Sequence, residues 1–157
     1  MLYCHVTQAS GGADATTTTG QAAGISATQS LGGAYSQGQA SSSATTMDGN
    51  AASLSSSLAG ASLVTRSIAT ASANSDQGAA LSSGWAGAFS GDADANAASS
   101  AATVVGNAAS VAQAYGLGVF NGKAAVAGSA GSEAGSAGGL SIGVATGLMQ
   151  AQSAVAS

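Results

Sequence analysis

Residues 80–90 read Ala-Leu-Ser-Ser-Gly-Trp-Ala-Gly-Ala-Phe-Ser, and they indicate the fold most clearly. Every second position carries Ala, Ser or Gly, and the positions between them include Leu81, Trp85 and Phe89. A period of two places successive side chains on opposite faces of an extended strand. The stretch therefore predicts a strand with one face of very small side chains and one face of larger ones.

The same alternation recurs in residues 110–119 and 140–148. The small positions there are Ser110, Ala112, Ala114, Gly116, Gly118, Ser141, Gly143, Ala145 and Gly147, and larger side chains such as Val111, Tyr115, Leu140 and Val144 stand between them. Both windows also contain apolar residues at helical spacing, so a helix stays an alternative there. The 24 glycines favour strands, because each one costs a helix about 1 kcal/mol relative to alanine.

Glycine and asparagine mark turns at intervals along the chain. The predicted turns are Gly11-Gly12, Gly32-Gly33, Asp48-Gly49-Asn50, Asn74 to Gly78, Gly91-Asp92, Gly106-Asn107, Asn121-Gly122 and Gly138-Gly139. Asn121-Gly122 is a hairpin signal, because both residues of a type I′ turn tolerate a positive φ. The gaps between turns fit strands of about ten residues, as in a β-solenoid or a meander of equal strands.

These patterns predict an all-β fold in a single domain over residues 1–157, with residues 1–10 as a terminal arm or a capping strand. We expect a tightly packed β-solenoid or a thin two-sheet sandwich with a Gly/Ala/Ser interior. Two sheets can approach closely when their facing side chains are this small. The predicted interior positions are Gly84, Ala86, Ala88, Ala112, Ala114, Gly116, Gly143 and Ala145.

The composition excludes several classes of function. Ala, Ser and Gly make up roughly three fifths of the chain, far above the globular average. Only 5% of residues are charged, and the two basic ones, Arg66 and Lys123, cannot neutralise a phosphate backbone. No apolar run is long enough to span a membrane. We therefore expect no nucleic-acid partner, no membrane partner and no small-molecule substrate.

Residues with catalytic chemistry are almost absent. The one histidine, His5, is adjacent to the one cysteine, Cys4. On a strand these neighbours point to opposite faces, so they do not form a catalytic pair. The phrase Asp92-Ala93-Asp94-Ala95-Asn96 is similar to the start of a calcium loop, but the later glycine and glutamate of that motif are missing. We interpret it as a solvated turn, and we expect no enzyme activity, cofactor or metal.

The segment Gly128–Gly139, Gly-Ser-Ala-Gly-Ser-Glu-Ala-Gly-Ser-Ala-Gly-Gly, resembles the Gly/Ala/Ser phrases of silk fibroins. The serine-rich stretches 41–46 and 53–57 resemble sericin-type silk coats. The tract Thr16 to Thr19 resembles the threonine rungs of beetle β-solenoid antifreeze proteins, although the other threonines do not recur at one place per coil. These resemblances imply a structural polymer or, alternatively, a monomeric ice-binding protein.

Edge protection is also weak in this sequence. Soluble β-proteins place proline, lysine or inward charges on strand edges, but this chain has no proline and one lysine. We therefore expect an extracellular, secreted structural protein that self-assembles into a filament or a silk-like or adhesive fibre. The N-terminus shows no signal peptide, which leads us to expect a mature form or a fragment. Cys4, Trp85 and Phe89 are the candidate intermolecular contacts.

Overall fold

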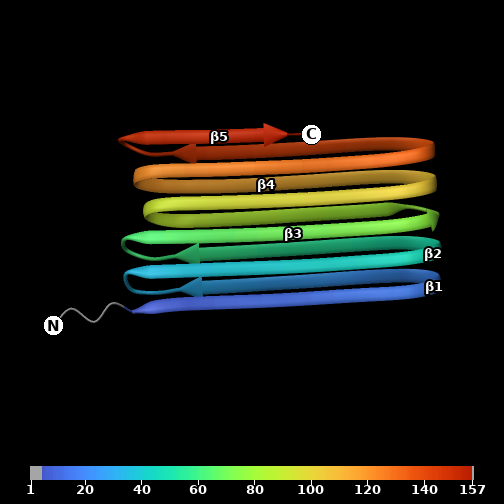
Figure 1. Cartoon of the computed structure of the whole chain (residues 1–157), viewed down its shortest axis with the longest axis horizontal. Coiled ribbons are helices and arrows are strands. Elements are labelled where there is room, and N and C mark those ends of the chain that lie inside the picture. The colour runs from blue at the N-terminus through green and yellow to red at the C-terminus, as the bar shows by residue number, and fades with distance from the viewer. Residues whose placement is uncertain (1–4, 157) are drawn as a thin grey trace.

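Parallel strands wind about one axis to form a flattened β-solenoid of about five coils (Figure 1). The computed structural model describes residues 5–156. Its strands are β1 (Val6–Leu31), β2 (Tyr35–Gly60), β3 (Val64–Gln77), β4 (Ala80–Thr146) and β5 (Gln150–Ala156). No residue in this range is helical. The predicted all-β solenoid is confirmed.

The coils have nearly the same length. Val6 pairs with Tyr35, which pairs with Val64, so 29 residues separate equivalent positions in these coils. The step from Val64 to Asp92 is 28 residues, and the step from Asp92 to Asn121 is 29. One coil contains two flat legs joined by two turns. The spacing between turns that the sequence predicts therefore corresponds to half a coil.

The two legs of every coil build two parallel sheets that face each other. Their inward side chains are mostly Ala, Ser, Gly and Thr, with Val126 as a larger exception, and the predicted interior residues Ala86, Ala88, Ala112 and Ala114 are 0% exposed. Gly84 and Gly116 are also buried, whereas Gly143 and Ala145 point inward in the last coil and are partly exposed. A Cβ added to Gly84 would lie 2.6 Å from the carbonyl oxygen of Ala98 in the opposite sheet. The prediction of a thin, tightly packed interior is confirmed.

Serine hydroxyls connect the two sheets across this interior. Ser42 Oγ and Ser53 Oγ lie 2.7 Å apart, and Ser99 Oγ and Ser110 Oγ lie 2.6 Å apart in the coil two steps further on. Each pair also contains a hydroxyl that donates to the partner residue's carbonyl oxygen. These bridges satisfy groups whose burial without a partner would be costly.

One kind of turn repeats along the edge that lies at the right in Figure 1. It contains the glycines with positive φ, which runs from 97° to 148° in Gly20, Gly49, Gly78, Gly106 and Gly135. Three residues before each glycine stands a serine or threonine: Thr17, Thr46, Ser75, Thr103 and Ser132. In the last three coils this hydroxyl donates to the carbonyl of the preceding coil's turn glycine. The turn thus couples neighbouring coils.

Several sequence predictions about turns are wrong. Residues 110–119 and 140–146 form strand as predicted, which removes the helical alternative for them. Asn121-Gly122 is not a hairpin: all strand pairs are parallel, and Gly122 has no positive φ. Gly11-Gly12 and Gly138-Gly139 lie within strands. Gly11 and Gly139 lie on the inward side of their legs, where the narrow interior requires small residues, so a glycine pair is not evidence of a turn in this fold.

Candidate functional site: two flat faces of opposite character

The solenoid has two broad outer surfaces, and we name them by their chemistry. The polar face consists of the outward residues of the legs 6–16, 35–45, 64–74, 92–102, 121–131 and 150–156. The apolar face consists of the outward residues of the legs 21–31, 50–60, 79–89, 107–117 and 136–146. The alternation of each leg decides which residues reach these faces.

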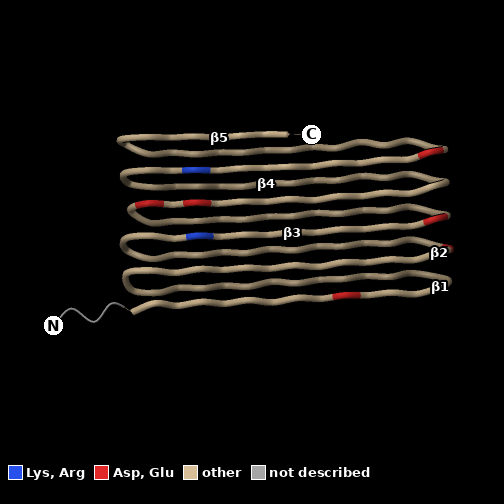
Figure 2. The backbone as a smooth tube through the Cα atoms, in the orientation of Figure 1, with Lys and Arg blue, Asp and Glu red and all other residues tan. Residues whose placement is uncertain are grey.

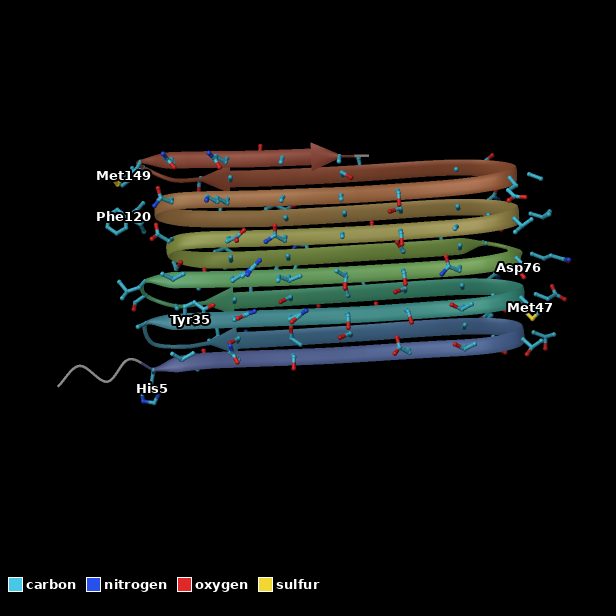
Figure 3. All side chains as sticks on the ribbon, viewed as in Figure 1. His5, Tyr35, Met47, Asp76, Phe120 and Met149 are labelled. Carbon is cyan, nitrogen blue, oxygen red and sulfur yellow. The ribbon has the colours of Figure 1, made fainter. Side chains whose placement is uncertain are left out.

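Every charged side chain lies away from the apolar face. Asp14, Arg66, Asp92, Asp94 and Lys123 belong to the polar face, and Asp48, Asp76 and Glu133 lie at the glycine turns (Figure 2). Figure 3 shows Asp76 and Met47 at this turn edge and Phe120 and Met149 at the opposite edge. The electrostatic character of the molecule is therefore confined to one face and one edge.

A small polar network occupies one part of the polar face. Asn121 donates to Asp92 Oδ1 at 2.6 Å, and Asn96 donates to Asp94 Oδ1 at 3.0 Å. The Arg66 Nε atom lies 3.9 Å from Asp94 Oδ2, and both side chains are about half exposed. The structure corrects our interpretation of residues 92–96 as a turn, because they run along a strand of β4 and alternation brings the polar side chains to one side.

Serine forms a regular column elsewhere on the polar face. Ser43, Ser72, Ser100 and Ser129 occupy equivalent outward positions in successive coils. The tract Thr16 to Thr19 does not extend into such an array. Thr16 is on the polar face, Thr17 Oγ1 donates to the Thr19 carbonyl at 2.8 Å, and the tract ends at the turn glycine Gly20.

Large aliphatic and aromatic side chains are exposed on the apolar face. The exposed fractions are 67% for Ile25, 64% for Leu31, 44% for Leu54, 52% for Leu81, 39% for Phe89 and 53% for Leu140. Asn, Gln, Ser, Thr, Ala and Gly occupy the outward positions of this face that do not carry large apolar residues, and the other large residues are Leu58, Trp85, Val111, Tyr115, Leu117, Ile142 and Val144. Scattered exposed leucines are ordinary in soluble proteins, whereas large apolar patches often belong to interaction sites.

The predicted contact residues Trp85 and Phe89 lie on this face, Trp85 near the middle of its leg and Phe89 at the end of it. The rings of Trp85 and Tyr115 are 6.2 Å apart between centroids. Gly87, between the two predicted residues, is covered by them: a Cβ there would lie 2.8 Å from Trp85 and 3.1 Å from Leu58. The side chains therefore spread flat over a glycine, which gives this half of the face a low, broad aromatic surface.

Sequence reasoning finds only part of this surface. Alternation identifies Leu81, Trp85 and Phe89 as one group, but it does not connect Ile25, Leu54 and Leu58 to them. The missed signal is the serine or threonine three residues before a glycine, which recurs once per coil and aligns the coils. His5 is exposed next to β1. The third predicted contact, Cys4, lies outside the described residues.

Comparison with protein-family models, with curated proteins and with solved structures found no match. Within residues 5–156, no three His, Cys, Asp or Glu side chains are grouped closely enough to hold a metal ion. The same part of the chain contains no helix with the length and apolarity needed to cross a membrane. The two faces and the strand edges are therefore the features from which a function can be argued.

Proposed function

We propose that this chain is an extracellular structural protein that self-assembles into a filament by stacking solenoids end to end. The observation that carries the proposal is the edge formed by β1, which pairs with β2 alone within residues 5–156. Its outward and inward residues include one charged side chain, Asp14, and no proline or lysine. Strand edges without such protection are templates for pairing with another chain.

The shape of the coils supports the same function. All coils have nearly the same length and stack in parallel register, so a second solenoid placed on the edge of the first continues the same ladder. The interior of Ala, Ser and Gly loses little side-chain entropy on ordering. A rigid, thin slab of this kind suits a mechanical role, and the proposal assigns the chain no catalytic activity.

The orientation of β1 allows a specific test. The Tyr35 N–H donates to the His5 carbonyl at 3.4 Å, and the alternation of a parallel ladder then directs the Gln8 N–H away from β2. Gln8→Pro removes this edge donor without removing a ladder bond. Negative-stain microscopy should show filaments for the parent chain and for Gln8→Ala, and few or none for Gln8→Pro. A parent chain that forms no filament under drying, shear or acidification would contradict the proposal.

Monomeric ice binding is the second candidate, and the serine column on the polar face favours it. Ser43, Ser72, Ser100 and Ser129 repeat once per coil on a flat surface of small side chains. The test is thermal hysteresis and ice-crystal shape in a nanolitre osmometer. Ice binding by this face predicts that Ser72→Tyr abolishes the hysteresis, and round ice discs with the parent chain would remove this candidate.

A further inference from the structure

The apolar face is large enough to form one side of a stable protein interface. With strands about 4.8 Å apart and a rise of about 3.3 Å per residue, a face five coils high and as long as residues 50–60 covers about 860 Å². Two such faces packed together would remove roughly 1,700 Å² from water, which is the size of a stable interface between proteins.

The chemistry of the face fits an identical partner. It carries no charged residue, so pairing two copies would bury no unpaired ion, the most costly group to desolvate. The charged residues, by contrast, lie on the opposite face and at one edge (Figure 2). Packing apolar face against apolar face leaves both polar faces in water.

The order of large and small residues is self-complementary in the legs 50–60 and 79–89 and partly so in the other three legs. Counting inward from the two ends of residues 79–89, Ala79 corresponds to Phe89, Leu81 to Gly87 and Ser83 to Trp85, so each large residue corresponds to a small one, with Leu81 meeting the side chains that cover Gly87. Residues 50–60 give the pairs Asn50 with Gly60, Ala52 with Leu58 and Leu54 with Ser56. In residues 21–31, Ala23 with Gln29 and Ile25 with Ala27 keep the pattern, and Gln21 with Leu31 departs from it. In residues 107–117, Ala109 with Tyr115 keeps the pattern, and Asn107 with Leu117 and Val111 with Gln113 depart from it. Residues 136–146 keep the pattern in Gly138 with Val144 and depart from it in Leu140 with Ile142.

We infer that two copies of this chain pair through their apolar faces about a two-fold axis that runs parallel to the solenoid axis along the middle of the face. Such an axis places every residue of a leg opposite its counterpart in the same leg of the other copy, so the pairs above become contacts. Large side chains then meet small ones, which is how facing sheets interdigitate. This inference deepens the proposed function and rests on it, because the paired solenoid is the unit that would stack.

A depression in the face matches the bulky part of the partner. A shallow trough of about 290 Å³ is lined by Ala23, Gly24, Ile25, Ala52, Ser53, Leu54, Leu81, Ser82, Ser83, Ala109 and Val111. The two-fold axis would bring the half of the partner's face that contains Leu58, Trp85 and Tyr115 over this trough. Aromatic side chains that fill a partner's recess are typical of the residues that dominate interface energies.

Sedimentation velocity over a range of concentrations tests the pairing. The diagnostic variants exchange a large and a small residue that the pairing places opposite each other. Ser56→Leu places leucine opposite Leu54 twice per dimer and should raise the dissociation constant at least tenfold. The double variant Leu54→Ser/Ser56→Leu restores one large and one small partner, and it should return the constant to within about threefold of the parent. Ser43→Leu, the same change on the polar face, is the matched control and should leave it unchanged. Leu81→Lys should give a monomer, and circular dichroism reports whether each variant is folded.

The outcomes separate the inference from the proposed function. A parent chain that is monomeric at every concentration, or a double variant as weak as Ser56→Leu alone, overturns the pairing. If Leu81→Lys still forms filaments and the parent shows no dimer, end-to-end assembly stands and the pairing is wrong. If neither dimers nor filaments form, both fail. If Leu81→Lys loses thermal hysteresis and Ser43→Leu keeps it, the apolar face binds ice, and the pairing is overturned.

Discussion

Otherwise equivalent coils of this solenoid differ in the presence of one buried serine hydroxyl. Ser42 and Ser99 occupy equivalent positions in their coils, and each bridges to a serine of the opposite sheet. The coil between them has Ala71 at that position. The facing hydroxyl, Ser82 Oγ, is buried and has no hydrogen-bond partner. This coil therefore has only one of the two serines that form the bridge in the neighbouring coils.

Ala71→Ser should complete this bridge and stabilise the protein. The new hydroxyl pairs with Ser82, as its equivalents do in the neighbouring coils, and a buried hydrogen bond contributes about 1 kcal/mol. Relief of the unpaired Ser82 hydroxyl adds to this, so we expect a gain of about 1–2 kcal/mol in urea unfolding. Ser82→Ala should stabilise the parent chain but destabilise the Ala71→Ser variant. The same sign in both backgrounds would disprove the bridge.

The turn glycines offer a second comparison between equivalent residues. Gly78 has a φ of 127°, and a Cβ there would collide with the carbonyl of Gly49 in the preceding coil. Gly20 has a φ of 97°, but a Cβ there would meet nothing within 4 Å. Both require a backbone conformation that L-residues avoid, and only Gly78 also lacks space.

Gly78→Ala should therefore cost more stability than Gly20→Ala. Backbone strain alone costs about 1–3 kcal/mol, and this is all that we expect for Gly20→Ala. The collision between coils should add about 1–3 kcal/mol for Gly78→Ala. Chemical denaturation of the two variants measures the difference. Equal losses of stability in the two variants would show that contact between stacked turns does not constrain these turn glycines.

At the scale of elements, the two sides of a leg in β4 should respond differently to the same substitution. Ala114 is 0% exposed and faces the opposite sheet, whereas Gln113 points outward onto the apolar face. Ala114→Leu inserts three carbons where the sheets are close together, and we expect a loss of about 3 kcal/mol or misfolding. Gln113→Leu should change the stability by only about 0.5 kcal/mol. Thermal melts of both variants test this; similar losses would contradict the assignment of faces.

The elements can be predicted from the sequence where alternation is unambiguous. Alternation with a period of two assigns Ala86, Ala114 and the other small residues on their side of the strand to the interior, because the larger residues all fall on the opposite side. The parallel winding cannot be predicted from alternation alone, and Asn121-Gly122 wrongly indicates a hairpin because the dipeptide reports local turn preference and not long-range pairing. Only part of the apolar face can be found in this way, since its residues come from legs that are one full coil apart in the sequence.

For the whole molecule, the stacked coils make stability nearly additive along one axis. Each coil contacts only the coils before and after it, as in other solenoids, so stability is a sum of similar units and their interfaces. A shift of the chain by one full coil returns each residue to the same face. A shift by half a coil moves residues from the polar face to the apolar face.

Removal of one complete coil should therefore leave a folded, shorter solenoid. Deletion of residues 64–91 joins Leu63 to Asp92 and lets the leg that begins at Tyr35 pair with the leg that begins at Asp92, the same kind of pairing that Tyr35 and Val64 make now. We expect a strand-type circular dichroism spectrum and a urea m-value lower by about one fifth, since m scales with the surface exposed on unfolding. Deletion of residues 64–77 alone removes one leg and its turn and brings residues 80–90 onto the polar side, so we expect aggregation or loss of the cooperative transition. If the two deletions behave alike, the full coil is not the folding unit of this protein.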